Sequence, residues 1–168
     1  MSSDAIVLLK EEHKEIRQLF RAYRATTEHD HAARGELAEE IVHAVTVYTY
    51  VEDEVVYPRV GALLPELEPE IRQGGQEHQL ADLLCTEITG LAPASEEFDA
   101  KVGVLIETVE RHIEREERDW FPRVRAGVGR KDLQEIGTRL LAVRETAPRP
   151  HPGPVSDPAT GAPESQGR

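Results

Sequence analysis

The chain has 168 residues and a formal net charge of −12 at pH 7, so it is long enough for one domain with its own core, and its acidity argues against nucleic acid and anionic membranes as partners. Its single cysteine, Cys85, cannot form an internal disulfide and suits a reducing compartment. The apolar run of residues 5–9 is too short for a secretory leader or a membrane span, so we expect a cytoplasmic protein.

Apolar residues at helical spacing predict two amphipathic helices in the first half of the chain. Residues 4 to about 26 carry one apolar stripe, and His13 lies on that stripe, so we expect it to face inward. A polar break follows at residues 26–35. The second helix then places Tyr48 and Glu52 among inward apolar positions, which makes Glu52 a carboxylate on a buried stripe.

Three prolines are expected to separate the second helix from the third. Proline cannot donate the intrahelical hydrogen bond, so Pro58 should end the second helix, and Pro65 and Pro69 should lie in a loop. The third helix is then expected to begin near residue 71 or 76 and to stop at Gly90. Its inner face includes His78, a second histidine on an apolar stripe.

Ser95 is the expected N-cap of a fourth helix, whose inner face includes His112 and Glu116. A short fifth helix is expected over residues 132–143, with the aspartate at its start as the N-cap. The segment after it is rich in proline and glycine and cannot bury enough apolar surface to offset its ordering entropy, so it should be disordered. The expected domains are a four-helix bundle at residues 1–147 and a Pro/Gly-rich tail at residues 148–168.

Two parts of the chain repeat each other. Residues 48–60 align without a gap to residues 112–124, and the alignment places Tyr48 opposite His112. A Glu-His pair precedes each copy, at residues 12–13 and 77–78. Because the repeat preserves residue types that bind metals, it predicts a dinuclear metal site between facing helices.

The spacing within each copy suits such a site. Side chains four residues apart lie one turn above each other, so Tyr48 with Glu52, and His112 with Glu116, can each point to one place. Imidazole and carboxylate ligands together suit iron, manganese or zinc, and two glutamates that can bridge a pair of ions favour iron. Two glutamates and one phenolate also supply the negative charge that buried cations require.

These motifs resemble the hemerythrin-like family, also called the HHE cation-binding domain. That family has one histidine on the first helix, His-x-x-x-Glu on the second, one histidine on the third and His-x-x-x-Glu on the fourth. The resemblance covers about residues 4–126 and implies an all-α fold, an antiparallel up-down four-helix bundle, with two non-haem iron ions joined by an oxo or hydroxo bridge. The ligands that it implies are His13, Glu52, His78, His112 and Glu116, with Tyr48 at the remaining position.

Two positions depart from the family pattern. Tyr48 stands where the family has the histidine of the second helix, and Gly74 stands where the oxygen-carrying members have another histidine. A phenolate is a hard anionic ligand that favours ferric over ferrous iron, which makes reversible oxygen storage less favourable. Fewer protein ligands also leave coordination positions open to peroxide, dioxygen or nitric oxide.

The resulting hypothesis is a di-iron protein that reacts with peroxide or related reactive oxygen and nitrogen species, as a catalase- or peroxidase-type oxidoreductase. Two alternatives are a protein that binds or senses oxygen, redox state or nitric oxide without turnover, and a metal-free structural bundle. Tyr50 competes with Tyr48 as the phenolate ligand, but two residues turn a helix by about 200°, which points Tyr50 away from Glu52.

The remaining polar and aromatic residues near the repeat have simpler interpretations. The acidic residues that follow each glutamate, including Asp53 and Glu117, are interpreted as a solvated face. Tyr57, Trp120 and Phe121 are expected to close the end of the bundle. His29 and His31 are interpreted as surface residues, and His43 as either solvated or placed around the ligands of the site.

Overall fold

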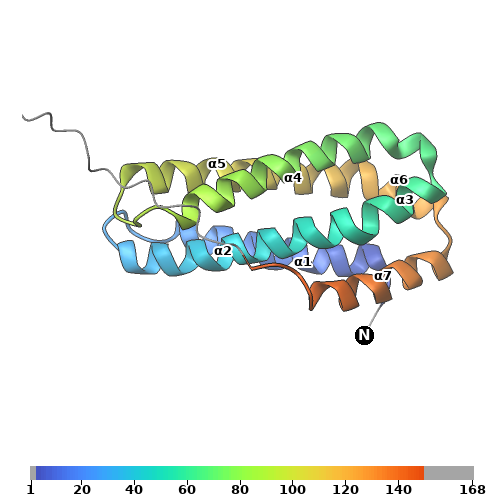
Figure 1. Ribbon diagram of the computed structural model, residues 1–168, viewed down its shortest axis with the longest axis horizontal. Coiled ribbons are helices and arrows are strands. Elements are labelled where there is room, and N and C mark those ends of the chain that lie inside the picture. Colours follow the sequence, from blue (N-terminus) through green and yellow to red (C-terminus); the bar gives the residue numbers. More distant parts are fainter. Residues whose placement is uncertain (1–2, 150–168) are drawn as a thin grey trace, which may run out of the picture.

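The computed structural model describes residues 3–149, and in this range the chain is helical without a strand. Four long helices run antiparallel, and α7 packs against α1 and α2 on one side of them (Figure 1). This confirms the expected all-α bundle with a short fifth helix. The helices are α1 (Ala5–Arg24), α2 (His31–Val51) continued by η1 (Glu52–Val56) and α3 (Tyr57–Leu63), α4 (Glu68–Thr89), α5 (Glu96–Arg115) continued by η3 (Glu116–Trp120) and α6 (Phe121–Gly127), and α7 (Arg130–Arg144), with a 3₁₀ turn, η2 (Pro65–Leu67), before α4.

Local sequence explains where most helices begin. Ser95 caps α5 as expected, since its side chain accepts a hydrogen bond from the Phe98 amide. The third bundle helix begins earlier than expected, at Glu68, because Pro69 lies in its first turn, where no amide donor is needed. The fifth helix also begins earlier. Gly129 is its N-cap, and Asp132 lies in the first turn, where a negative charge is favourable at the helix N-terminus.

The expectation that Pro58 ends the second helix is wrong. The helix continues to Leu63 through a π-helical turn in which the Tyr57 amide donates to the Glu52 carbonyl, five residues back. A wider turn leaves room for the proline ring, which in an α-helix clashes with the carbonyl four residues back. The second copy of the repeat has the same arrangement, because the Phe121 amide donates to the Glu116 carbonyl before Pro122.

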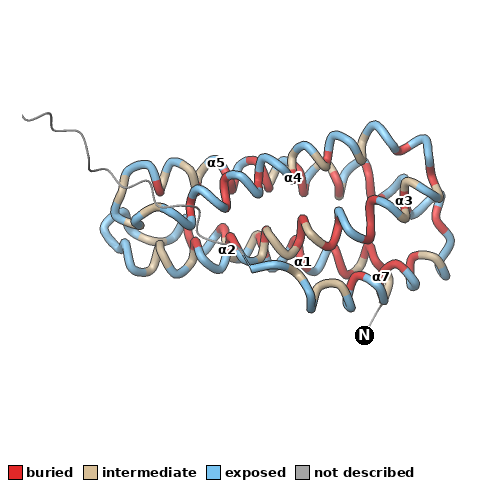
Figure 2. Tube along the Cα trace, in the orientation of Figure 1, coloured by how far each residue is buried: buried red, intermediate tan, exposed pale blue. Residues whose placement is uncertain are grey.

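Buried residues face one another along the inside of the four helices (Figure 2). Most are aliphatic or aromatic, but a layer of buried histidine and glutamate side chains interrupts them at the level of the π-helical turns. Among the described residues, no helix has both the length and the apolar character that a membrane span requires. Residues 150–168 of the expected tail lie outside the described part of the chain.

Candidate metal centre

The structure brings all six predicted ligand side chains together inside the bundle. They come from different helices, and each is at most 4 % exposed. The two glutamates are the first residues of the π-helical turns, a position at which functional residues often lie. The six are His13 of α1, Tyr48 of α2, Glu52 of η1, His78 of α4, His112 of α5 and Glu116 of η3.

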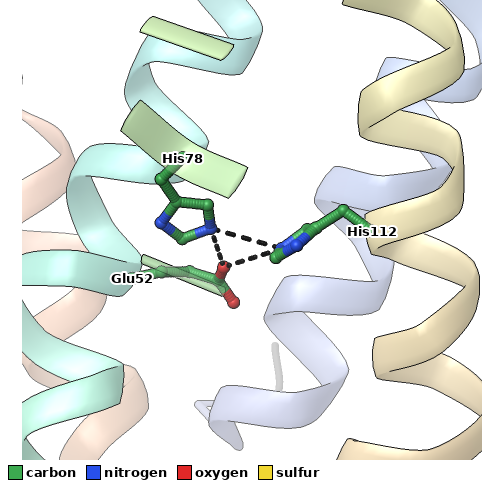
Figure 3. A group of neighbouring side chains, drawn as sticks. All are labelled: Glu52, His78 and His112. Atoms are coloured by element: carbon green, nitrogen blue, oxygen red, sulfur yellow. Dashed lines mark hydrogen bonds and ion pairs between the residues drawn. The ribbon is translucent and has the colours of Figure 1, made fainter. Parts of the chain in front are cut away.

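One half of the centre consists of Glu52, His78 and His112 (Figure 3). The Nε2 atoms of the two histidines lie 3.2 Å apart. Glu52 Oε2 lies 3.1 Å from His78 Nε2 and 3.6 Å from His112 Nε2. One nitrogen or oxygen atom from each of the three residues therefore faces a common point, as metal ligands do.

The other half consists of His13, Tyr48 and Glu116. His13 Nε2 lies 2.8 Å from the Tyr48 hydroxyl and 3.3 Å from Glu116 Oε2. The Tyr48 hydroxyl also donates a short hydrogen bond to Glu116. The second oxygen of Glu116 lies 3.4 Å from His112 Nε2. Glu116 thus connects the two halves, as a carboxylate that bridges two ions would.

Each histidine of the centre is held by a carboxylate outside it. The Nδ1 atom donates to this carboxylate, so a neutral imidazole keeps its hydrogen on Nδ1 and turns the lone pair of Nε2 toward the centre. Carboxylates in this position orient metal-binding histidines and raise their basicity. The pairs are His13 with Glu117 at 2.8 Å, His78 with Asp53 at 2.7 Å, and His112 with Glu77 at 2.7 Å.

The interpretation of Asp53 and Glu117 as a solvated face is therefore incomplete. Both side chains are partly exposed, but each accepts a hydrogen bond from a histidine of another helix. Arg17 fixes Glu117 further, with Nη1 2.9 and 3.0 Å from its two oxygens. The repeat contained the information that would have found these partners, since both acids directly follow the glutamate of their copy.

The Tyr48 corner of the centre differs from the His112 corner. In the repeat, Glu12 corresponds to Glu77 and Tyr48 to His112, but a tyrosine has no second nitrogen to donate to Glu12. Glu12 instead pairs with Arg144 of α7, and its Oε2 has no hydrogen-bond partner among the described residues. Burial raises the pKa of Glu12 to about 7, although Arg144 acts in the opposite direction.

We expect Glu77→Gln to weaken metal binding by about 10- to 100-fold, because the carboxylate that orients His112 loses its charge. Glu12→Gln is the matched control: it makes the same change in the other copy of the repeat, where no histidine is held. Titration of metal-free protein with ferrous iron measures both affinities. Equal losses in the two variants would contradict a specific role for Glu77.

Tyr57 belongs to the centre, although the sequence suggested only that it closes the bundle end. Its ring stacks on His78, with centroids 5.1 Å apart and an interplanar angle of 6°. Its hydroxyl lies 3.4 Å from His78 Nε2 and donates to Glu116 Oε1 at 3.3 Å. The equivalent ring in the repeat, Phe121, stacks on His13. The repeat thus indicated the ring position but could not indicate the hydroxyl.

Gly74 makes this position of Tyr57 possible. A Cβ atom at residue 74 would lie 2.3 Å from the Tyr57 hydroxyl oxygen, which is closer than side-chain carbons approach. Gly74 is the position at which the resemblance expects a histidine in oxygen carriers. In this chain, the phenol of Tyr57 therefore occupies the space next to His78 that a side chain at residue 74 would take.

The charges in the centre fit a cation. Glu52 is fully buried, and neither of its carboxylate oxygens has a hydrogen-bond partner among the described residues, although the Nε2 atom of His78 lies close to one of them. A buried carboxylate without compensation is strongly destabilising. With Nδ1 hydrogens turned outward, the Nε2 lone pairs of His78 and His112 also face each other. Metal ions would compensate the charge of Glu52 and accept the two facing lone pairs, so the residues present fit a metal site.

Without metal, protons provide this compensation. Burial lowers the pKa of His78, but the hydrogen bond to Asp53 and the nearby carboxylate of Glu52 outweigh it and raise the pKa to about 9. Burial likewise opposes charge on Glu116, but His112 and His13 hold the pKa of this carboxyl well below its usual value. Burial, followed by the charges of Glu116 and Glu52, raises the pKa of Tyr48 well above 10. Tyr48 is therefore a neutral hydrogen-bond donor in the metal-free protein.

These shifts predict how the stability of the metal-free protein depends on pH. The folded pKa of His78 lies above its ordinary value of 6.5, so its contribution is fully present below pH 6.5 and is lost as pH rises through about 9. The shift corresponds to on the order of 3 kcal/mol of unfolding free energy. We expect denaturant unfolding of the metal-free protein to show this loss between pH 6.5 and 9. An unfolding free energy that rises across this range would contradict it.

Comparisons with known proteins agree with this architecture. The family model for the hemerythrin HHE cation binding domain matches residues 4–124. A solved structure of a hemerythrin HHE cation binding domain-containing protein from Mycobacterium kansasii superposes with a TM-score of 0.70 and 22 % identity, over 85 % of this chain and 86 % of that one. A protein from Nostoc sp. (strain PCC 7120) named DNA nickase is 23 % identical over 137 residues, which are 82 % of this chain but only 38 % of the Nostoc protein. The match over most of the chain shows that this protein belongs to the hemerythrin HHE cation-binding domain family.

Proposed function

We propose that the protein binds two non-haem iron ions in this centre and reacts in the cytoplasm with peroxide or related reactive oxygen and nitrogen species, as a catalase- or peroxidase-type oxidoreductase. The observation that carries the proposal is the set of buried imidazole and carboxylate groups that face one another, with Glu52 lacking a hydrogen-bond partner among the described residues. The group of Glu52, His78 and His112 lies next to a second group of His13, Tyr48 and Glu116, and the Glu116 carboxylate between them favours two ions over one.

The proposed ligands divide between the two halves. One ion would be held by His78 and His112, and the other by His13 and Tyr48. Glu116 contacts both halves, and Glu52, which contacts the first half, would bridge as well by similarity to the family. Ligands of imidazole nitrogen and carboxylate oxygen suit iron, and the bound ions would supply the electrons that peroxide chemistry exchanges. The ligand set leaves no thiolate, which favours iron or manganese over metals that prefer sulfur.

The protein's own groups prepare the centre for this chemistry. Glu52 and Glu116 supply negative charge against buried cations, and the outer carboxylates keep the histidine nitrogens directed inward. Tyr57 donates a hydrogen bond to Glu116, which holds one proton beside the centre. Loss of the Tyr48 proton on metal binding would add a hard anionic ligand that favours ferric iron.

A second candidate is binding or sensing of oxygen or nitric oxide without turnover. The family relationship supports it as well as it supports catalysis, because a fold does not fix the reaction. The nickase activity in the name of the Nostoc protein is not proposed for this chain. The shared region is a minor part of that protein, and a net charge of −12 opposes binding to a phosphate backbone.

Peroxide consumption by iron-loaded protein separates the two candidates. We expect the wild-type protein to consume hydrogen peroxide over many turnovers per iron pair, followed by a peroxide electrode, and we expect the metal-free protein to be inactive. A protein that keeps two iron ions but does not turn over peroxide would reject the enzymatic reaction and leave binding or sensing.

A further inference from the structure

A small cavity lies beside the centre and is lined by residues of α3, α4, α5, η3 and α6. Helices α3 and α6 lie at one end of the bundle (Figure 1). The volume of the cavity is about 160 Å³. Two of its lining residues, Tyr57 and Glu116, are buried and belong to the centre, whereas Asp119 and Arg123 have side chains about half exposed. The wall of the cavity therefore includes both buried residues of the centre and residues at the protein surface.

Trp120 gives this cavity an unused hydrogen-bond donor. The side chain lines the cavity and is only 5 % exposed, and its ring packs edge-on against Tyr57 with centroids 5.4 Å apart. Within residues 3–149 the indole Nε1 has no acceptor, and Glu70 Oε2 on the cavity wall has no donor. Buried polar atoms normally find partners, so both groups point to a polar occupant of the cavity.

The size of the cavity limits what this occupant can be. A water molecule takes about 30 Å³ in the liquid, so the cavity has room for roughly five, far less than the space of pockets that bind drug-sized molecules. Hydrogen peroxide, a small molecule that both accepts and donates hydrogen bonds, is small enough for the cavity and can pair with the two unpartnered groups. A cavity of about 150 Å³ holds one benzene molecule, so a hydroperoxide with a phenyl ring and further carbon groups exceeds the available space.

A larger cavity on another side of the bundle is the alternative path by which a small molecule could reach the centre. It has a volume of about 410 Å³ and is lined by Tyr48, Ala44, Glu12 and Arg144 among others. Of the centre's residues it reaches Tyr48, and the atoms without hydrogen-bond partners on its wall, Glu12 Oε2 and Arg144 Nε, belong to two side chains that already form an ion pair with each other. The smaller cavity reaches two groups of the centre and offers a neutral donor without a partner.

We propose that the smaller cavity, which we call the Trp120 cavity, admits the small peroxide on which the centre acts and holds it through the indole N–H of Trp120. The proposal rests on the proposed function and adds substrate selection to it: hydrogen peroxide is accepted, and bulky organic hydroperoxides are excluded. In this proposal Trp120 binds the peroxide, and Tyr57 and Glu116 are the residues of the centre that the peroxide contacts at the inner end of the cavity.

Entry through the Trp120 cavity is tested by placing the same side chain, a phenylalanine, in each of the two cavities. Asp119→Phe places a ring at the mouth of the Trp120 cavity, and Ala44→Phe places one in the larger cavity. With azide as a probe of the iron-loaded protein, we expect the association rate to fall about tenfold or more in Asp119→Phe and to stay within about twofold in Ala44→Phe. The reverse pattern, or equal rates in all three proteins, would overturn the route.

A second measurement does not depend on iron. Trp120 is the only tryptophan in the sequence, so the fluorescence of the metal-free full-length chain reports on this cavity. We expect acrylamide to quench wild type and Ala44→Phe alike, and to quench Asp119→Phe much less. Equal quenching in all three would overturn the route even if iron binds. A wild type that shows the expected quenching and azide rates but no peroxide turnover would instead reject only the proposed reaction.

The hydrogen bond from Trp120 to the bound molecule is tested by Trp120→Phe, which keeps an aromatic ring and removes the donor. Loss of one hydrogen bond of ordinary strength predicts an azide affinity about fivefold lower, with the association rate retained. Wild-type affinity in this variant would overturn the role of the indole N–H. Cumene hydroperoxide, which exceeds the cavity, should react much more slowly than hydrogen peroxide, and comparable rates for the two would overturn the size selection.

Discussion

Replacing Glu52 by glutamine is expected to remove most of the iron from the protein. Glu52 is fully buried, and its Oε2 lies 3.1 Å from His78 Nε2 and 3.6 Å from His112 Nε2, so its charge faces the place that metal ions would occupy. A neutral amide cannot offset two buried cations. Because changes in the residues around metal ligands already cost 10- to 100-fold, we expect the loss of this ligand to cost more than about 100-fold in iron affinity.

The control for this experiment is Glu54→Gln, which makes the same chemical change at an exposed position two residues along the chain. It should retain wild-type iron content by elemental analysis. Circular dichroism of both metal-free variants separates loss of metal from loss of fold. A folded Glu52→Gln variant with the iron content of wild type would show that Glu52 does not bind the ions.

Replacing Tyr48 by phenylalanine is expected to abolish a phenolate-to-iron charge-transfer band in the visible spectrum of the ferric protein. The Tyr48 hydroxyl lies 2.8 Å from His13 Nε2 and donates a hydrogen bond to Glu116, so it lies among the proposed ligands of one half of the centre. Tyr57 has a hydroxyl farther from its neighbours, at 3.3 and 3.4 Å, and we expect it to remain a hydrogen-bond donor.

Two tyrosine variants serve as comparisons. Tyr57→Phe should keep the band with a shifted maximum, because Glu116 loses a hydrogen bond while Tyr48 stays in place. Tyr50→Phe should leave the spectrum unchanged, since Tyr50 lies at a partly exposed position of α2 and lines a different cavity, beside Asp82 and Cys85. A band that persists in Tyr48→Phe and disappears in Tyr57→Phe would assign the phenolate to Tyr57.

The sequence predicted the bundle and the six inward side chains because both depend on periodicity. Apolar residues at helical spacing mark the face that is buried, and a polar residue on that stripe, such as His13 or Glu52, must then point to the interior. The internal repeat added the relation between helices that periodicity alone does not provide. The N-cap of α5 at Ser95 was predictable from local chemistry in the same way.

The errors have two physical causes. Pro58 was expected to end a helix because an α-helix has no room for its ring, and a π-helical turn is not visible in the pattern of apolar residues. Partners on other helices are the second cause. The contacts of Asp53 with His78, and of Tyr57 with His78, depend on the register between helices, which no single helix determines. The predicted tail lies almost entirely outside the described residues.

Anomalous X-ray diffraction at the iron absorption edge, from crystals of the protein as isolated, tests the central claim most directly. The account predicts two separate iron peaks inside the bundle, one between His78 and His112 and one beside His13 and Tyr48, with Glu52 and Glu116 next to both. Crystals that contain iron but show no iron peak in this pocket, or iron peaks only on the surface, would contradict it.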